Sequence, residues 1–299
     1  MSLDQFIQLL AAVTLFEMMA AIGLGVTFAE VLGVARNWRL VGRAALANYV
    51  CVPAAAVGLL LLCQARPLVA AGFLIAAVCP GAPYGPPFTA LARGNVVRAV
   101  GLMVILAGSS ALIAPLLLHF LLPVTSGSQP LDVDAGKMVS TLLVAQFLPL
   151  CVGLALRHWR PALAGRLQKP ANRLSLLLNV GLLTLIISAQ FDLLTAIPLR
   201  AFAGMLALVI AGLAAGWLLG GPGRENRIAL TMATSVRNVG VCLVLVTAGF
   251  AGTEAVTAAT AFGLFQTLVI AVIALGWGRL ANAAGALERP VLTGTSAES

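Results

Sequence analysis

The sequence predicts an all-α polytopic membrane protein with nine transmembrane helices, arranged as two inverted repeats that each contain one discontinuous helix. Three observations predict this fold class. Of the 299 residues, 61% are hydrophobic and only 9% are charged, whereas soluble domains carry about 25% charged residues. Apolar runs recur that are long enough to cross a bilayer, which takes roughly 20 residues each. Two of these runs are interrupted at mid-depth by proline, glycine or polar residues.

The apolar runs are separated by short polar joints or by glycine and proline. They cover residues 5–30, 39–62, 67–93, 95–122, 137–157, 171–194, 199–220, 225–249 and 254–282. Each run is predicted to form one helical crossing. The third and eighth runs contain the interruptions. The remaining residues, 283–299, are polar and are predicted to form a disordered cytoplasmic tail.

Lysine and arginine are distributed unequally between the joints. One side of the membrane collects 14 of them, namely Arg36, Arg39, Arg43, Arg93, Arg98, Arg157, Arg160, Arg166, Lys169, Arg173, Arg224, Arg227, Arg279 and Arg289. The other side collects Arg66, Lys137 and Arg200. Because cytoplasmic loops hold the excess of Lys and Arg, the N-terminus is predicted outside and the C-terminus in the cytoplasm, in a bacterial inner membrane. These cations stand singly, so they do not indicate nucleic-acid binding.

The positions of the two interruptions predict an inverted repeat. They lie five crossings apart, so equivalent segments run through the membrane in opposite directions, over residues 1–122 and 137–282. In such transporters, discontinuous helices present half-helix ends and free backbone groups to the substrate near the midplane. The sequence holds no HExxH or GxSxG motif, and its five cysteines show no zinc-site spacing. We therefore expect a transporter rather than an enzyme, with no cofactor and no bound metal.

The first interruption is predicted near residues 80–88, within the segment CPGAPYGPPFT at residues 79–89. Its four prolines are incompatible with a continuous helix, because each lacks a backbone donor and clashes with the preceding turn. The alternative is a proline kink in an ordinary helix. A half-helix that begins near Tyr84 would direct its N-terminal dipole toward the break and favour an anion there. Tyr84, Gly85 and Thr89 are therefore candidate substrate-binding residues.

The second interruption is predicted near residues 233–240, within the segment TMATSVRNVG at residues 231–240. Arg237 is its strongest indicator, because a charged side chain at mid-membrane is costly and usually faces a cavity, a partner or a substrate. The alternative is a structural arginine, satisfied by backbone carbonyls or an internal acid. Thr234, Ser235 and Asn238 are further candidates for substrate binding. Asn238 has the alternative role of a hydrogen bond to the first interruption.

Glu17 is the only acidic residue that falls near the middle of a predicted crossing. It is a candidate for a salt bridge to Arg237 or for carrying a proton. The alternative is a shallower position in the membrane.

Both interruptions resemble elements of the bile acid:sodium symporter family. The family's CPGG opening and LA(K/R)G(N/D) close are matched by CPGA at residues 79–82 and LARGN at residues 91–95, with the same spacing. Residues 23–28, GLGVTF, are similar to its GMGLTL element, and residues 237–240, RNVG, fall where it has QNSG. The resemblance implies a core domain, formed by the second to fourth and seventh to ninth crossings, and a panel domain that moves against it. The panel would be the first, fifth and sixth crossings, without the family's usual first helix.

The resemblance also implies where sodium ligands would stand, and this chain departs from the family there. The positions equivalent to the family's sodium ligands are Gly85, Pro86, Ala99, Met103, Ala233 and Arg237, with Asn48 where an upstream glutamine contributes. Nearly all of the ligand oxygens are missing. A guanidinium would also repel a cation by roughly 4 kcal/mol at about 4 Å in an effective dielectric of about 20. We therefore expect sodium binding to be lost or weak.

These features predict a secondary transporter of a small or amphipathic organic anion that works by alternating access. Arg237 would bind the anionic group and Asn48 would complete the lining, with transport uncoupled, by exchange, or proton-linked through Glu17. One alternative is a sodium-coupled symporter with rearranged sites. Another is a binding or sensory protein that no longer cycles, with Arg237 paired to Glu17. The expected partners are the lipid bilayer and the anion; the spacing of Gly212 and Gly216 suits helix packing within one chain as well as between chains, so it does not fix the oligomeric state.

Overall fold

The computed structural model describes residues 2–126 and 134–287. All regular structure in these ranges is helical. The helices are α1 (Leu3–Gly25), α2 (Phe28–Ala35), α3 (Trp38–Leu46), α4 (Val52–Leu62), α5 (Pro67–Ala77), α6 (Gly85–Leu91), α7 (Val96–Ser126), α8 (Ala135–Leu142), α9 (Leu148–Trp159), α10 (Pro161–Ala189), α11 (Phe191–Thr195), α12 (Leu199–Leu219), α13 (Arg224–Ser235), α14 (Val239–Phe250) and α15 (Glu254–Leu287). Two short π-helical turns, η1 (Ala47–Cys51) and η2 (Leu143–Phe147), join α3 to α4 and α8 to α9.

Eight helical spans in the described ranges are long and apolar enough to cross a membrane. They overlap eight of the predicted runs, because a span of lipid-facing residues is set mainly by its length and hydropathy. Two limits differ: the first crossing ends at Gly25 and is followed by the separate helix α2, and the sixth starts at Pro161, well before the predicted run 171–194. The remaining run, the third, is divided into α5 and α6, and α5 alone is a shorter apolar helix. The prediction of an all-α polytopic membrane protein is therefore confirmed.

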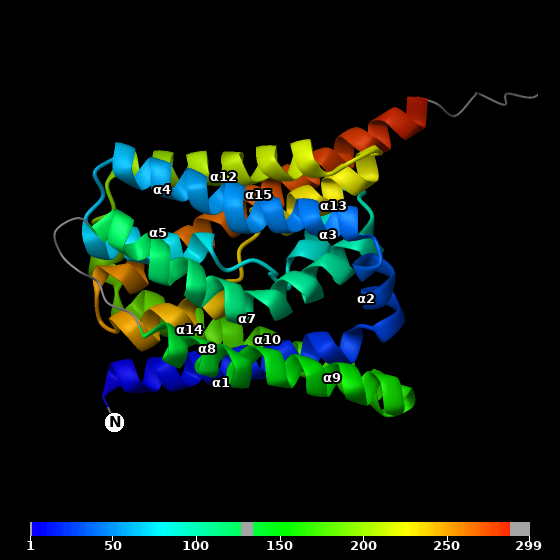
Figure 1. Ribbon diagram of the computed structural model, residues 1–299, viewed down its shortest axis with the longest axis horizontal. Helices are drawn as coiled ribbons and strands as arrows, with labels where there is room; N and C mark the ends of the chain where they lie inside the picture. Colours follow the sequence, from blue (N-terminus) through cyan, green and yellow to red (C-terminus); the bar gives the residue numbers. More distant parts are fainter. Residues whose placement is uncertain (1, 127–133, 288–299) are drawn as a thin grey trace, which may run out of the picture.

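The helices form two groups, which Figure 1 shows along its lower and upper sides. In the lower group, α1 packs against α9 and α10, and α9 packs against α10. In the upper group, α12 packs against α4 and α13, and α15 packs against α5. The groups meet where α14 contacts α1 and where α7 contacts α8 and η2. We call α1, α8, η2, α9 and α10 the panel and α3–α7 with α12–α15 the core, since they contain the crossings that the resemblance assigns to those domains.

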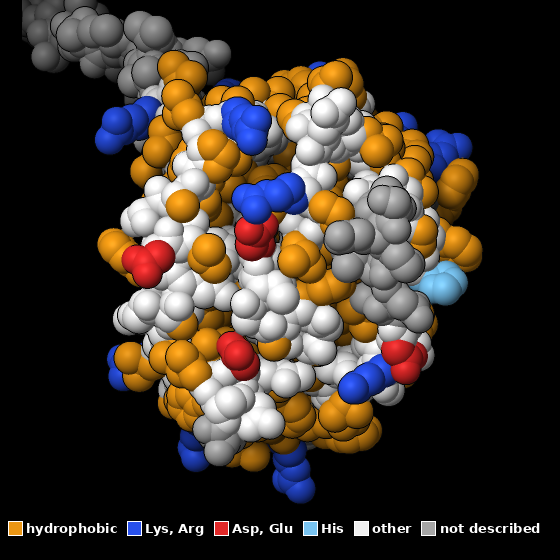
Figure 2. All heavy atoms as spheres, turned by 90° about the vertical axis from the view of Figure 1, so that its left-hand side faces the viewer, with side chains coloured by type: hydrophobic (Ala, Val, Ile, Leu, Met, Phe, Trp, Pro, Cys, Tyr) orange, Lys and Arg blue, Asp and Glu red, His pale blue; other side chains and the backbone are white. Residues whose placement is uncertain are grey.

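The polar joints gather at the two ends of the bundle. At one end, the backbone N–H of Asn95, between α6 and α7, donates to the carbonyl of Glu225 in α13 at 3.0 Å. The joints there carry most of the cations, and we call it the arginine-rich end. At the other, arginine-poor end, Arg66 Nη1 lies 2.8 Å from Glu254 Oε1 and ties α5 to α15. Figure 2 shows the arginine-poor end, with acidic and basic side chains among polar groups and hydrophobic side chains around much of the edge.

Two glycines of α12 allow close packing against α13. A Cβ on Gly216 would lie 2.9 Å from the backbone nitrogen of Thr231, and a Cβ on Gly212 would lie 3.2 Å from the Cα of Ser235. A real Cβ essentially never approaches backbone as closely as at Gly216 and seldom as closely as at Gly212, so α12 and α13 touch through bare backbone at Gly216 and pack tightly at Gly212. The small-residue spacing of α12 is therefore used inside this chain.

The predicted boundary of the C-terminal tail was placed too early. Helix α15 continues to Leu287, into the segment expected to be disordered. The residues there are mostly alanine, which has the highest helix propensity and so extends a helix beyond the membrane-spanning part. Residues 288–299 of the predicted tail lie outside the described residues.

Candidate functional site

The third crossing contains a true discontinuity rather than a proline kink. Helix α5 ends at Ala77, and α6 begins at Gly85 with Tyr84 as its N-cap residue. Pro86 and Pro87 lie in the first turn of α6, where a missing N–H is not needed for the helix. The proline cluster therefore ends one helix and starts another, as predicted.

The break in the eighth crossing is shorter than its polar sequence suggested. Helix α13 ends at Ser235 and α14 begins at Val239. The hydroxyls of Thr231 and Ser235 each donate to the carbonyl four residues earlier, both at 2.7 Å. This local bonding satisfies the hydroxyls inside a helix. Of the predicted interruption near residues 233–240, only residues 236–238 are therefore non-helical.

Asn238 joins the two breaks. Its backbone N–H donates to the carbonyl of Cys79 at 2.8 Å, and its side-chain amide Nδ2 donates to the carbonyl of Gly81 at 3.2 Å. Its Oδ1 accepts from the backbone N–H of Val241 at 3.2 Å and caps α14. The alternative role considered for Asn238 is thus present, and its polar groups are engaged by the protein. We expect it to position the site rather than to bind substrate.

Gln266 of α15 holds the backbone of Arg237 from the other side. Its Oε1 accepts from the backbone N–H of Arg237 and its Nε2 donates to the carbonyl of the same residue, both at 3.1 Å. Gln266 is fully buried. Gln266 was not among the residues predicted from the sequence, although a lone amide in an apolar crossing, FGLFQTLVI, is the kind of costly group that indicates a specific partner.

Replacing Gln266 with leucine is expected to lower the melting temperature Tm by about 5 °C or more, because two buried backbone groups of Arg237 lose their partners at about 1–3 kcal/mol each. Thr267→Val is the matched control, since the Thr267 hydroxyl donates only to the carbonyl of Gly263 in its own helix. Thermal unfolding in detergent measures both variants. Equal Tm values for Gln266→Leu and the wild type would contradict the assigned role.

The side chain of Arg237 is buried between the two breaks, with 2% of its surface exposed. Its Nη2 donates to the carbonyl of Thr234, whereas its Nη1 has no hydrogen-bond partner among the described residues. Asn48 also contacts Thr234: its Nδ2 donates to Thr234 Oγ1 at 3.3 Å and to the carbonyl of Ala44 at 2.9 Å. Its Oδ1 likewise lacks a partner in the described ranges. An unused cationic donor and an unused acceptor therefore both adjoin Thr234.

Each π-helical turn carries one buried amide. Asn48 lies in η1, and Gln146 lies in η2 of the panel. Gln146 Nε2 donates to the carbonyl of Ala107 and, at 2.9 Å, to Ser110 Oγ, both on α7 of the core. Its Oε1 has no partner within the described part of the chain. Because π turns often occur at functional sites, Gln146 is a second residue of interest that was not among those predicted from the sequence.

The candidate residues of the first break differ in their hydrogen bonds and in the space around them. Tyr84 is half-buried, and no hydrogen bond of its hydroxyl is found among the described residues. Gly85 is buried, yet a Cβ built on it would meet no atom within 4 Å. Thr89 is buried and its hydroxyl donates to the carbonyl of Gly85 at 2.9 Å. In the second break, the Ser235 side chain lies beside Gly212 of α12. Space next to Gly85 is therefore more relevant to binding than either hydroxyl.

Glu17 does not approach Arg237. It is half-buried on α1, and its carboxylate accepts a hydrogen bond from Ser175 of α10, so the contact stays within the panel. Among the described residues, the only ion pair is the one between Arg66 and Glu254. The proposed Arg237–Glu17 salt bridge is therefore not formed.

At the family's sodium-ligand positions, Asn48 contributes one side-chain oxygen, Oδ1, and the other residues contribute none. Ala99 and Met103 of α7 and Ala233 of α13 are buried. Pro86 is also buried, in the first turn of α6. The loss of sodium binding stays a prediction.

Comparison with known proteins agrees with this geometry. The model of the "Sodium Bile acid symporter family" matches residues 12–216, which include the first break and end before the second. The "Uncharacterized sodium-dependent transporter YocS" of Bacillus subtilis (strain 168) is 24% identical over 279 residues, which cover 89% of this chain and 83% of that protein. Since the family model spans well over half of the 299 residues, the chain belongs to the sodium bile acid symporter family.

Proposed function

We propose that the protein is a secondary transporter of a small or amphipathic organic anion and that Arg237 binds the anionic group. The observation that carries this proposal is the buried Nη1 of Arg237, which has no partner among the described residues. Leaving a buried donor unpaired costs about 1–3 kcal/mol, and more when the group is charged. A carboxylate, sulfonate or phosphate oxygen of the substrate would accept from it in a strong, charge-assisted hydrogen bond.

Asn48 adds a second requirement for the substrate. Its Oδ1 is an acceptor without a partner in the described ranges, and both Asn48 and Arg237 bond to Thr234. An anion that also carries a hydroxyl or amide N–H matches this pair better than a simple carboxylate. The open space beside Gly85 would take part of its apolar body. Tyr84, with no hydroxyl partner found in the described chain, would border the same space.

Alternating access requires the panel to move against the core. Two contacts cross the boundary between panel and core close to the site. Gln146 bonds across it to α7, and a Cβ on Gly240, in the first turn of α14, would lie 2.7 Å from Met18 Cε of α1. A rearrangement of the panel would therefore change the packing directly beside the second break. In the proposed orientation the arginine-rich end faces the cytoplasm.

The transport is expected to be sodium-independent: uncoupled, by exchange, or proton-linked. Counterflow of a labelled organic anion into proteoliposomes, chosen by a thermal-shift screen of anions, should proceed at the same rate in sodium and in choline. If it is proton-linked, Glu17→Gln should remove the pH dependence of uptake without changing anion binding, because Glu17 lies in the panel beside Ser175. Ser175→Ala is the control that removes the hydrogen bond and keeps the carboxyl group.

A sodium-coupled symporter is the second candidate, because the Bacillus subtilis relative is named a sodium-dependent transporter. Uptake that stops in choline would support it and contradict the sodium-independent proposal. Substrate binding without any counterflow would instead support a non-transporting binding protein.

A further inference from the structure

A cavity of about 360 Å³ opens at the arginine-poor end of the core. It is lined by parts of α4, α5, α11, α12 and α15 and by the joints before α5 and α12. No residue of either break lines it, so it is separate from the candidate site at Arg237. In the proposed orientation it faces the outside.

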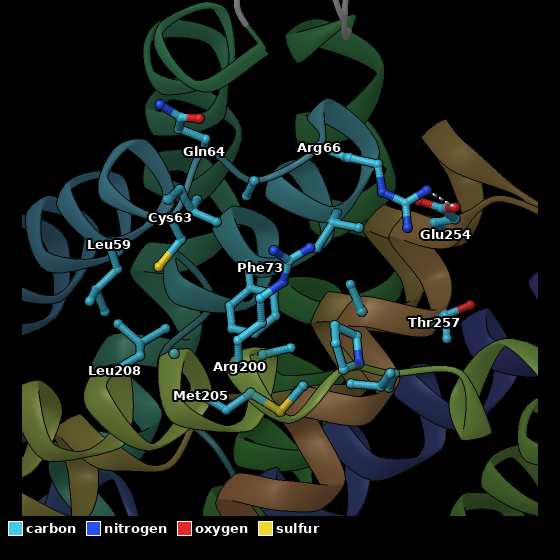
Figure 3. A pocket seen from close by; sticks show the side chains of 18 of the residues that line it. Leu59, Cys63, Gln64, Arg66, Phe73, Arg200, Met205, Leu208, Glu254 and Thr257 are labelled. Carbon is cyan, nitrogen blue, oxygen red and sulfur yellow. Dashed lines mark hydrogen bonds and ion pairs between the residues drawn. The ribbon is translucent and has the colours of Figure 1, made fainter.

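The lining combines an apolar interior with cationic groups at its mouth. Figure 3 shows the side chain of Arg200 running from α12 into the cavity past the ring of Phe73, with Leu59, Met205 and Leu208 on the apolar side. Arg66 is neutralised by Glu254 at 2.8 Å. Arg200 is exposed and forms no ion pair or hydrogen bond with the described residues, so no protein group neutralises its charge.

Two helix N-termini add to this positive charge. Helix α5 starts after Arg66 and α12 starts after Pro198, and neither N-cap side chain bonds to its helix. Both N-cap residues line the cavity. Each N-terminus carries a positive partial charge, which an anion stabilises and a cation such as Arg200 opposes. The C-terminal ends of α4 and α11 also border the cavity and oppose these dipoles. Because Arg66 is paired with Glu254, Arg200 is the one charged residue of the lining without an ion-pair partner among the described residues.

We propose that this cavity binds an amphipathic monoanion, with its carboxylate, sulfonate or phosphate on Arg200 and its apolar part against Phe73, Leu59 and Leu208. The volume lies near the lower end of the range for ligand pockets, about 300–1,000 Å³, which favours a compact apolar part such as a medium-length acyl chain. The anion comes either from solution or from the headgroup of an anionic lipid. Binding here does not depend on the function proposed for Arg237.

Cys63 supplies the test, because it is exposed and lines the cavity. Its alkylation by a water-soluble maleimide is measured by mass spectrometry in a Cys151→Ser background, in phosphatidylcholine nanodiscs. Octanoate at about ten times its dissociation constant is expected to slow the reaction about tenfold. Octanamide, which has the same chain without the charge, is expected to have little effect.

Arg200→Gln is expected to abolish the protection by octanoate, whereas Lys137→Gln, a cation outside the cavity lining, retains it. Nanodiscs that contain phosphatidylglycerol distinguish the source. If that lipid alone slows the reaction in the wild type but not in Arg200→Gln, the membrane supplies the anion; if only octanoate does, the anion comes from solution. Equal protection by octanoate and octanamide, or full protection in Arg200→Gln, would overturn the proposal. The measurement needs no flux, so such a failure would leave the proposed transport function standing.

Discussion

Arg237→Gln is expected to weaken binding of the transported anion by about 10- to 100-fold and to reduce counterflow accordingly. The substitution removes the positive charge and the unpartnered Nη1 donor but keeps a polar side chain. Hydrogen bonds to charged groups contribute about 1.5–3 kcal/mol, and each 1.4 kcal/mol corresponds to about a tenfold change in affinity. The screen identifies an anion, and its binding to each variant is measured by calorimetry or by the shift in the protein's Tm.

The same variant separates a binding arginine from a structural one. A buried charge with an unpaired donor is costly to the empty protein, so Arg237→Gln is expected not to lower the Tm of the empty protein. Arg237→Lys keeps the charge but loses the planar fork, and an intermediate affinity is expected. Lys137→Gln, at an exposed position, controls for loss of net charge. Unchanged anion affinity with a lowered Tm in Arg237→Gln would assign the residue to structure, through its bond to the carbonyl of Thr234.

The crossings were predictable from the sequence because hydropathy and length determine which segments span a bilayer. The limits of the second break were not predictable, because polar residues can also lie within a helix. Thr231 and Ser235 bond to carbonyls of their own helix, which no count of polar residues reveals. The predicted C-terminal end of α15 was wrong for a related reason, because alanine extends a helix irrespective of the membrane boundary.

The site was predictable only in part. Asn48 and Arg237 both contact Thr234, as expected for polar and charged groups at mid-depth, which need specific partners. Their role in substrate binding stays a prediction. Ser235 lies beside Gly212 of α12 rather than beside Asn48, since neighbouring residues of a helix point about 100° apart, and its role in substrate binding stays a prediction. The contacts of Gln266 and Gln146 depend on the tertiary fold, which places distant segments side by side.

The cavity at Arg200 could not be found from the sequence either. Its walls come mainly from α4, α5, α12 and α15, and each of these helices reads as an ordinary apolar crossing. Arg200 itself was recognised only as one of the few cations on the outer side. Nothing in its local sequence distinguishes a cation that faces a cavity from one that extends into water.

Gly81→Ala is expected to cost about 3 kcal/mol or more and to lower Tm by about 6–12 °C, because left-handed strain and overpacking act together. Gly81 has φ +80°, and a Cβ on it would lie 2.6 Å from the Cα of Ala107 in α7. Its carbonyl also accepts from Asn238 Nδ2 at 3.2 Å. Any shift that relieves the clash therefore moves the group that joins the two breaks.

Gly85→Ala is the matched control in the same segment. A Cβ at Gly85 meets no atom within 4 Å, so little change in Tm is expected. Unfolding is followed with a thiol-reactive dye, since Cys79 and Cys242 are buried in the folded protein. A similar loss of Tm in both variants would mean that the segment tolerates no side chain anywhere. A loss of Tm confined to Gly81→Ala would show that Gly81 holds the two breaks together. Weaker anion binding by the stable variant Gly85→Ala would show that the space beside Gly85 belongs to the substrate.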